Sequence, residues 1–168
     1  SGQATIRLGM FEVWSTNSAG NKGTLTTKNK SLGWCHKTVF AGRLFINKAT
    51  ISSGYARVLY GGETGIGFEF ANDGTLYCIH GNPTPGYSSI ALESYNVQDT
   101  IHVMVVWYPP STCEEDEITG SGSYSSDGSI EVYLEGEFKA SDSGFGFGGM
   151  LHPIYMEAYT EVDNEPVT

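Results

Sequence analysis

Residues 65–77 have the sequence Gly-Ile-Gly-Phe-Glu-Phe-Ala-Asn-Asp-Gly-Thr-Leu-Tyr, and this stretch decides the fold class. Its apolar residues alternate with small or charged ones over 66–70, which is the period of a strand with one buried face. Asn72-Asp73-Gly74 then supplies residues that tolerate positive φ, and Leu76 begins a second alternating run. We therefore expect a β-hairpin at this point.

The rest of the chain follows the same pattern. Its 168 residues (18.2 kDa) include 22 glycines and 6 prolines, so closely spaced that no amphipathic helix of about ten residues fits between them. The sequence predicts one all-β domain over 1–168, a two-sheet antiparallel β-sandwich. The expected strands are 6–13, 38–46, 55–60, 66–70, 75–80, 101–108, 130–134 and 154–159. The run of apolar residues over 101–108 predicts a central strand.

The net charge of −10 excludes several partners. Nucleic acid and anionic membranes would be repelled, and no stretch approaches the ~18 apolar residues of a membrane span. The charge is uneven, because residues 1–60 carry 8 − 1 = +7 and residues 61–168 carry 1 − 18 = −17. We expect these halves to neutralise each other between neighbouring strands.

Three long polar segments separate the expected strands, at 15–31, 81–89 and 111–125. Long loops of a compact domain are commonly functional, so these are predicted to form a binding edge. The chain begins Ser1-Gly2-Gln3 without a methionine, and we interpret it as part of a larger protein.

From Tyr55 to about residue 140 the order of elements resembles the concanavalin A-like lectin/glucanase jelly roll, in particular its laminin G-like members. The resemblance rests on the 65–77 hairpin, on the strand Ile-His-Val-Met-Val-Val-Trp at 101–107, and on Ser129 to Gly136, where Glu135 stands at a position at which Asp is commoner. It implies one flat or convex and one concave sheet, with glycans or protein partners bound at the concave face or at rim loops.

Catalytic patterns find little support. The glycosidases of this family show Glu-x-Asp-x-Glu or a close variant, and Glu131, Glu135 and Glu137 come nearest to it, with Gly136 marking an expected turn. The four histidines are scattered, and no Gly-x-Ser-x-Gly elbow accompanies them. For His102, at the start of a core strand, we expect a hydrogen-bonded structural role. No catalytic residue is predicted.

The three cysteines are Cys35, Cys78 and Cys113. Cys35-His36 and Cys78-Ile79-His80 could supply zinc ligands, but these residues are not spaced like the ligands of structural zinc sites. An odd count also leaves one thiol over in any disulfide scheme. A reduced, partly buried set is the simplest interpretation, which points to a reducing compartment or to a particle assembled in one.

The densest charge is the acidic run at 114–117. Carboxylates there, Glu114 and Asp116 above all, could bind calcium as hard oxygen ligands, and calcium supports glycan binding in many domains of the resembled family. A solvated acidic loop is the favoured alternative, because calcium ligands are usually spaced by glycine or asparagine. No other cofactor is expected.

Loop aromatics are the candidate ligand-binding residues. Sugar rings pack their C–H faces on Trp or Tyr while Asn, Asp and Glu bind their hydroxyls. Trp34, Tyr87, Tyr95 and Tyr124 lie in or near the polar loops, whereas Trp14, Tyr77 and Trp107 lie in or beside strands and are predicted to be core residues.

The sequence thus predicts a non-catalytic recognition or adhesion module that binds carbohydrate. Its partner would be a glycan or a cell-surface receptor, at an extracellular, cell-surface or virion-surface location. One alternative is a projecting domain of a virus capsid or fibre, which would form a homo-oligomer. The other alternative is a glycoside hydrolase, with Glu131 or Glu135 as the carboxylate to test.

Overall fold

The structure, a computed structural model, describes twelve stretches of the chain. They are residues 3–7, 10–14, 20, 22–26, 35–45, 54–60, 65–71, 73–81, 88–96, 99–115, 122–145 and 154–160. All regular elements in these stretches are β-strands, which confirms the predicted all-β class. A search of the same stretches for a long apolar helix that could cross a membrane finds none.

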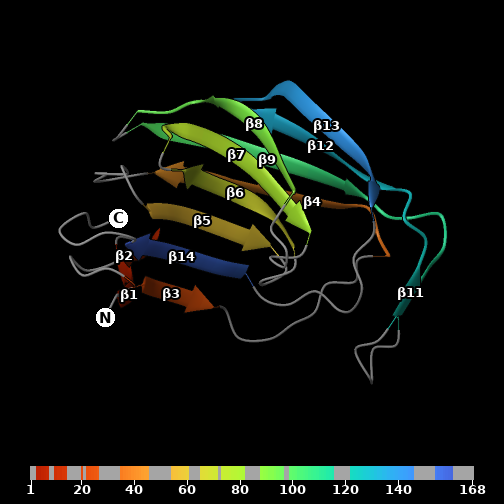
Figure 1. Ribbon diagram of the computed structural model, residues 1–168, viewed down its shortest axis with the longest axis horizontal. Helices are drawn as coiled ribbons and strands as arrows, with labels where there is room; N and C mark the ends of the chain where they lie inside the picture. The colour runs from red at the N-terminus through yellow and green to blue at the C-terminus, as the bar shows by residue number, and fades with distance from the viewer. Residues whose placement is uncertain are drawn as a thin grey trace.

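The strands form two main antiparallel sheets (Figure 1). The six-stranded sheet has the order β3 (Lys22–Thr26), β14 (Ile154–Thr160), β5 (Gly54–Tyr60), β6 (Gly65–Ala71), β7 (Thr75–Gly81), β8 (Ser88–Ser94). The four-stranded sheet has the order β13 (Glu137–Phe145), β12 (Gly128–Leu134), β9 (Thr100–Tyr108), β4 (Thr38–Phe45). Two smaller hairpins join β1 (Gln3–Arg7) to β2 (Met10–Trp14) and β10 (Cys113–Glu115) to β11 (Gly122–Tyr124).

The core lies between the two sheets, as a β-sandwich requires. Apolar side chains at alternate positions of β4, β9 and β12 pack against those of β6 and β7. The largest side chains with no exposed area are Trp107, Phe68, Ile66, Leu76, Ile130 and Leu134. Trp107 is therefore a core residue, as predicted.

The strand β9 is central in its sheet, as its apolar run predicts. It pairs with β4 on one side and with β12 on the other. Along β12, buried and partly exposed residues alternate, so the predicted face pattern is confirmed. Glu135 and Gly136 form the two-residue turn to β13, with φ of 52° and 83°. Positive φ at both positions matches the right-handed twist of a hairpin.

Several predicted boundaries were wrong. The single strand expected over 6–13 is a hairpin of β1 and β2. The segment 15–31 contains β3, the segment 81–89 contains the start of β8, and the segment 111–125 contains β10 and β11. The strand β13 was not predicted at all. These strands carry many polar side chains, and their backbone hydrogen bonds to neighbours replace the missing apolar pattern.

The prediction of a fully reduced cysteine set was also wrong. Cys35 and Cys113 form a disulfide with Cα atoms 5.3 Å apart, whereas Cys78 is free and buried. The pairing follows from the register, because Thr38 at the start of β4 lies opposite Trp107 near the end of β9. Residues just before β4 and just after β9 therefore meet at one end of the sheet. Burial raises the pKa of the Cys78 thiol to about 12, so it is an inert core side chain.

Candidate functional site

The outer face of the six-stranded sheet carries a row of polar and aromatic side chains. On β6, Phe68 and Phe70 point into the core, so Glu69 between them lies on the outer face. The register places Arg57 of β5 and Tyr77 of β7 directly opposite Glu69, one on each side. Three neighbouring strands thus present a cation, a carboxylate and a phenol side by side.

Arg57 is held on this face by two partners. Its Nη2 lies 3.2 Å from Oε2 of Glu69, and its guanidinium carbon lies 3.7 Å from the centre of the Tyr55 ring. The side chains of Arg57 and Glu69 are only 15% and 21% exposed. An ion pair so placed is screened less than a surface pair, and ring stacking limits the rotamers of the guanidinium. This is the neutralisation between the basic and acidic halves that the sequence predicts.

A pocket of about 280 Å³ opens beside this pair. Glu69, Tyr77, Ile79 and Ser89 line it, and they come from β6, β7 and β8. The pocket therefore combines a carboxylate, a hydroxyl and an aromatic ring with one buried aliphatic side chain. Small-ligand sites likewise combine an apolar surface with a few convergent polar groups.

Tyr77 is oriented by the hairpin turn at its own strand end. Its hydroxyl donates to Oδ2 of Asp73 at 2.6 Å, and Oδ1 of Asp73 accepts the backbone N–H of Thr75 at 2.8 Å. The hydrogen bond from Tyr77, followed by the one from Thr75, lowers the pKa of Asp73. The same hydrogen bond raises the pKa of Tyr77. Tyr77 is thus a neutral phenol whose ring, rather than its hydroxyl, is available to a ligand.

The raised pKa of Tyr77 bears on what this face can do chemically. A general base works best when its pKa lies near the working pH, and hydrogen bonding to Asp73 moves Tyr77 away from that range. Stacking and hydrogen bonding need no such tuning. The hydrogen bond to Asp73 therefore makes Tyr77 a weaker general base than an unpaired tyrosine would be.

Tyr95 lies after β8 and braces the β6–β7 turn. Its ring packs edge to face on Phe70 with centroids 4.8 Å apart, and its hydroxyl donates to the carbonyl of Ala71 at 2.9 Å. Burial raises the pKa of Tyr95 to about 12. Its ring and hydroxyl are both engaged within the protein, and its assignment to a ligand site stays a prediction.

Tyr124 and Glu114 are brought together on the β10–β11 hairpin. Cys113 pairs with Tyr124, and Glu114 pairs with Ser123, whose hydroxyl lies 3.4 Å from the Glu114 carboxylate. Both Tyr124 and Glu114 are exposed. The other predicted residues, Trp34, Tyr87 and Asp116, lie outside the described residues. The described part of the chain has no group of three metal-ligating side chains, and calcium binding stays a prediction.

Asp127 fastens this hairpin to the sandwich. Its Oδ1 accepts the backbone N–H of Ser111 at 3.0 Å and the hydroxyl of Ser125. A hydrogen bond from the Ser111 side chain, followed by those from the Ser125 side chain and the Ser111 backbone, lowers the pKa of Asp127 to about 2. Because the folded pKa lies below the unfolded value of about 3.9, the stabilisation is present above pH ~4 and is lost as the pH falls towards 2.

We therefore expect Asp127→Asn to lower the melting temperature at neutral pH. The difference from the parent protein should shrink between pH ~4 and pH ~2, since the parent then protonates the same carboxyl. Thermal unfolding followed by circular dichroism at a series of pH values measures it. A difference that stays constant down to pH ~2 would contradict the assigned hydrogen bonds.

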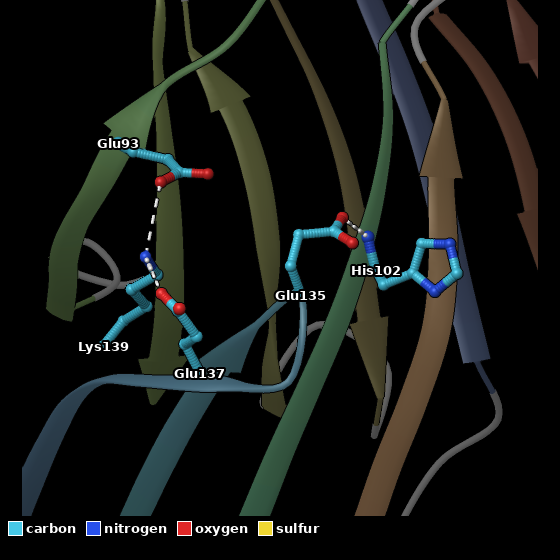
Figure 2. Close-up of polar contacts among 5 residues, drawn as sticks. All are labelled: Glu93, His102, Glu135, Glu137 and Lys139. Carbon is cyan, nitrogen blue, oxygen red and sulfur yellow. Dashed lines mark hydrogen bonds and ion pairs between the residues drawn. The ribbon is translucent and has the colours of Figure 1, made fainter.

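The carboxylates considered for glycoside hydrolysis have separate structural partners. Oε1 of Glu135 accepts the backbone N–H of His102 at 2.7 Å, and Glu137 lies 3.4 Å from Nζ of Lys139. Figure 2 shows the Glu135 and Glu137 carboxylates directed to these different partners. Glu131 accepts the hydroxyls of Tyr108 and Tyr133. They form no facing acid pair of the kind that hydrolysis uses.

The histidines also differ from expectation. At His102 the backbone N–H makes the structural hydrogen bond, while the residue is exposed. His80 is the buried one, 4% exposed, and its Nε2 lies 2.8 Å from Oδ2 of Asp142 on β13. This contact links the two sheets. Cys35 is bound in the disulfide, which removes it from any zinc site.

The residues lining the pocket were missed by sequence reasoning. Tyr77 was predicted to be core because it lies on a strand, yet it is only partly buried. The available signal was that Glu69 and Tyr77 occupy outward positions on the two arms of one predicted hairpin.

Searches with the structure find similar folds in solved proteins. An endo-β-1,4-glucuronan lyase from the fungus Trichoderma reesei aligns over 99% of this chain and 83% of its own, with 8% identity and a TM-score of 0.59. The carbohydrate-binding module CBM66 from Bacillus subtilis aligns over 99% and 88%, with 9% identity and a TM-score of 0.54. The binding domain of botulinum neurotoxin serotype D aligns over 92% of this chain and 36% of its own, with 16% identity and a TM-score of 0.54.

At these identities the likeness shows the fold alone, a β-sandwich jelly roll. The sequence matches no protein-family profile and no curated protein.

Proposed function

We propose that this domain is a non-catalytic carbohydrate-binding module whose sugar site is the pocket on the six-stranded sheet. The observation that carries the proposal is the grouping of Tyr77, Ile79, Glu69 and Ser89 around one opening on the outer face of the sheet. The Tyr77 ring would stack on the C–H face of a sugar, and the carboxylate of Glu69 and the hydroxyl of Ser89 would bind its hydroxyl groups.

Two further observations support this function. The proteins of similar fold include a carbohydrate-binding module, the binding domain of a neurotoxin and a glucuronan lyase. The Cys35–Cys113 disulfide favours an oxidising location outside the cytosol, where glycans and surface receptors are met.

Calorimetric titration of soluble oligosaccharides, chosen from a glycan-array screen run with and without EDTA, tests the proposal. We expect Tyr77→Ala to weaken binding roughly tenfold, because the stacked ring is lost. Tyr77→Phe should keep most of the affinity, since the hydroxyl is already used on Asp73. Loss of binding in EDTA would assign calcium a part in the site.

The matched control is Tyr133→Ala on the other sheet. Tyr133 is likewise a partly buried tyrosine whose hydroxyl donates to a carboxylate, here Glu131 at 3.0 Å, so its removal should leave sugar affinity unchanged. Affinity that survives Tyr77→Ala and falls with Tyr124→Ala would move the site to the β10–β11 hairpin. An array without any bound glycan, or release of unsaturated sugars from a polysaccharide, would overturn the proposal.

A further inference from the structure

Exposed apolar side chains gather on the outer face of the four-stranded sheet. Among the described residues, four large apolar side chains are exposed, and three of them lie on this face. They are Val39 (55% exposed) and Phe45 (46%) on β4 and Phe138 (57%) on β13. The fourth, Tyr124, lies on β11. Exposed apolar groups that share one face of a folded domain make that face a candidate docking surface.

The apolar surface continues across the whole sheet. The register aligns Ala41, Met104, Tyr133 and Phe138 in one row across β4, β9, β12 and β13. The rings of Tyr133 and Phe138 meet edge to face with centroids 5.7 Å apart. The row joins the exposed groups of the two edge strands into one surface.

Four polar side chains on or beside this face already have partners within the chain. Oε2 of Glu131 accepts the hydroxyls of Tyr108 at 2.9 Å and of Tyr133 at 3.0 Å. Nζ of Lys37 lies 4.5 Å from the centre of the Tyr108 ring. Covering a polar group costs less when its hydrogen bonds are made, so these groups oppose the covering of the face less than unbonded ones would.

The charges at the two sides of the face have opposite sign. Lys37 and Arg43 lie beside and on β4, whereas Glu131 and Glu135 lie on β12 and in the turn after it. A two-fold axis parallel to the strands would set β4 of one copy against β12 and β13 of the other. The cationic side of each copy would then face the acidic side of the other, so the two-fold axis gives two equivalent charge contacts. The basic first part of the chain and the acidic second part thus supply the two sides of a face that is complementary in charge to a second copy of itself.

We propose that this face binds a second copy of the chain, giving a two-fold symmetric dimer with the two four-stranded sheets packed face to face. Sheets pack in this way about 10 Å apart when apolar side chains interdigitate. The pockets on the six-stranded sheets would point away from the interface on opposite sides of the dimer. The inference stands on the apolar and charged groups above and does not depend on sugar binding.

Sedimentation velocity of the full chain without sugar tests the dimer at concentrations up to about 100 μM. We expect a species of twice the 18.2 kDa chain mass. Phe138→Glu and Val39→Glu should each raise the dissociation constant by roughly thirtyfold or more, because each places a carboxylate among the apolar side chains of the proposed interface. Tyr124→Glu is the control, since it adds the same charge at an exposed aromatic outside the face.

Circular dichroism and thermal unfolding will show whether each variant remains folded. We expect that it does, because the substituted side chains are exposed. Arg43→Glu should also favour the monomer, by setting two acidic sides against each other, while Arg43→Lys should keep the dimer. A parent protein that stays monomeric overturns the proposal, as does a dimer that persists in folded Phe138→Glu and Val39→Glu. A dimer unaffected by Arg43→Glu overturns the proposed orientation of the two copies.

Discussion

Replacing Trp107 with alanine is expected to lower the free energy of unfolding by about 3 to 5 kcal/mol. Trp107 has no exposed area and lies on the central strand β9, paired with Thr38 and Ile130. Its ring fills space between the two sheets, and neighbouring strands on both sides restrain any collapse into the cavity. Since domains of this size unfold at about 5 to 15 kcal/mol, the loss is a large part of the total. Urea unfolding with linear extrapolation measures it.

Two variants on β9 separate the loss of core volume from other effects. Trp107→Phe retains an aromatic ring and should cost clearly less than the alanine substitution. Met104→Ala truncates a partly exposed side chain on the opposite face of the same strand, so its effect should be smaller still. A loss below about 1 kcal/mol for Trp107→Ala would contradict its position between the sheets.

Those elements with one buried face were predictable from the sequence. Ile66, Phe68 and Phe70 alternate because burial on one side imposes a period of two residues, and Asp73-Gly74 supplies the turn that joins β6 to β7. The same reasoning found β12 and placed β9 at a sheet centre. In each case the buried face requires apolar residues at alternate positions, so the position of the core can be recognised in the sequence.

Strands with little buried side-chain surface could not be recognised in this way. The strand β8 has exposed residues at five of its seven positions, and Ile90 and Leu92 alone face the core. The two strands β10 and β11 consist of three residues each. Such segments are strands because their backbone groups pair with a neighbour, and propensity depends strongly on that context.

The candidate site was hidden for a related reason. The expected site used aromatic residues in polar loops, whereas the pocket uses outward positions on three neighbouring strands. Arg57 comes to lie beside Glu69 only through the register of β5 with β6, and Ser89 joins them through the register of β7 with β8. Strand register is fixed by the packing of the opposite, apolar face of the sheet. It therefore cannot be predicted from the residues of the site alone.

The disulfide depends on register in the same way. The odd number of cysteines did not allow a disulfide to be predicted from the sequence. In the structure, β4 lies antiparallel to β9, which brings Cys35 and Cys113 to one end of the sheet. The two cysteines are 78 positions apart in sequence, and the segment between them includes β4 to β9, most of the core. Closing so long a loop restricts the unfolded chain strongly.

Removing this disulfide by Cys35→Ser and Cys113→Ser is expected to lower the free energy of unfolding by about 2 to 4 kcal/mol, and up to roughly 4.5 by the chain-entropy relation for a loop of this length. Urea unfolding measures the loss, and reduction of the parent protein should reproduce it. Thiol titration supplies the control, because the denatured parent should expose the single free thiol of Cys78 before reduction and all three thiols after it. Three reactive thiols before reduction would contradict the disulfide. An unchanged stability in the double variant would mean that the unfolded chain stays compact around the core strands.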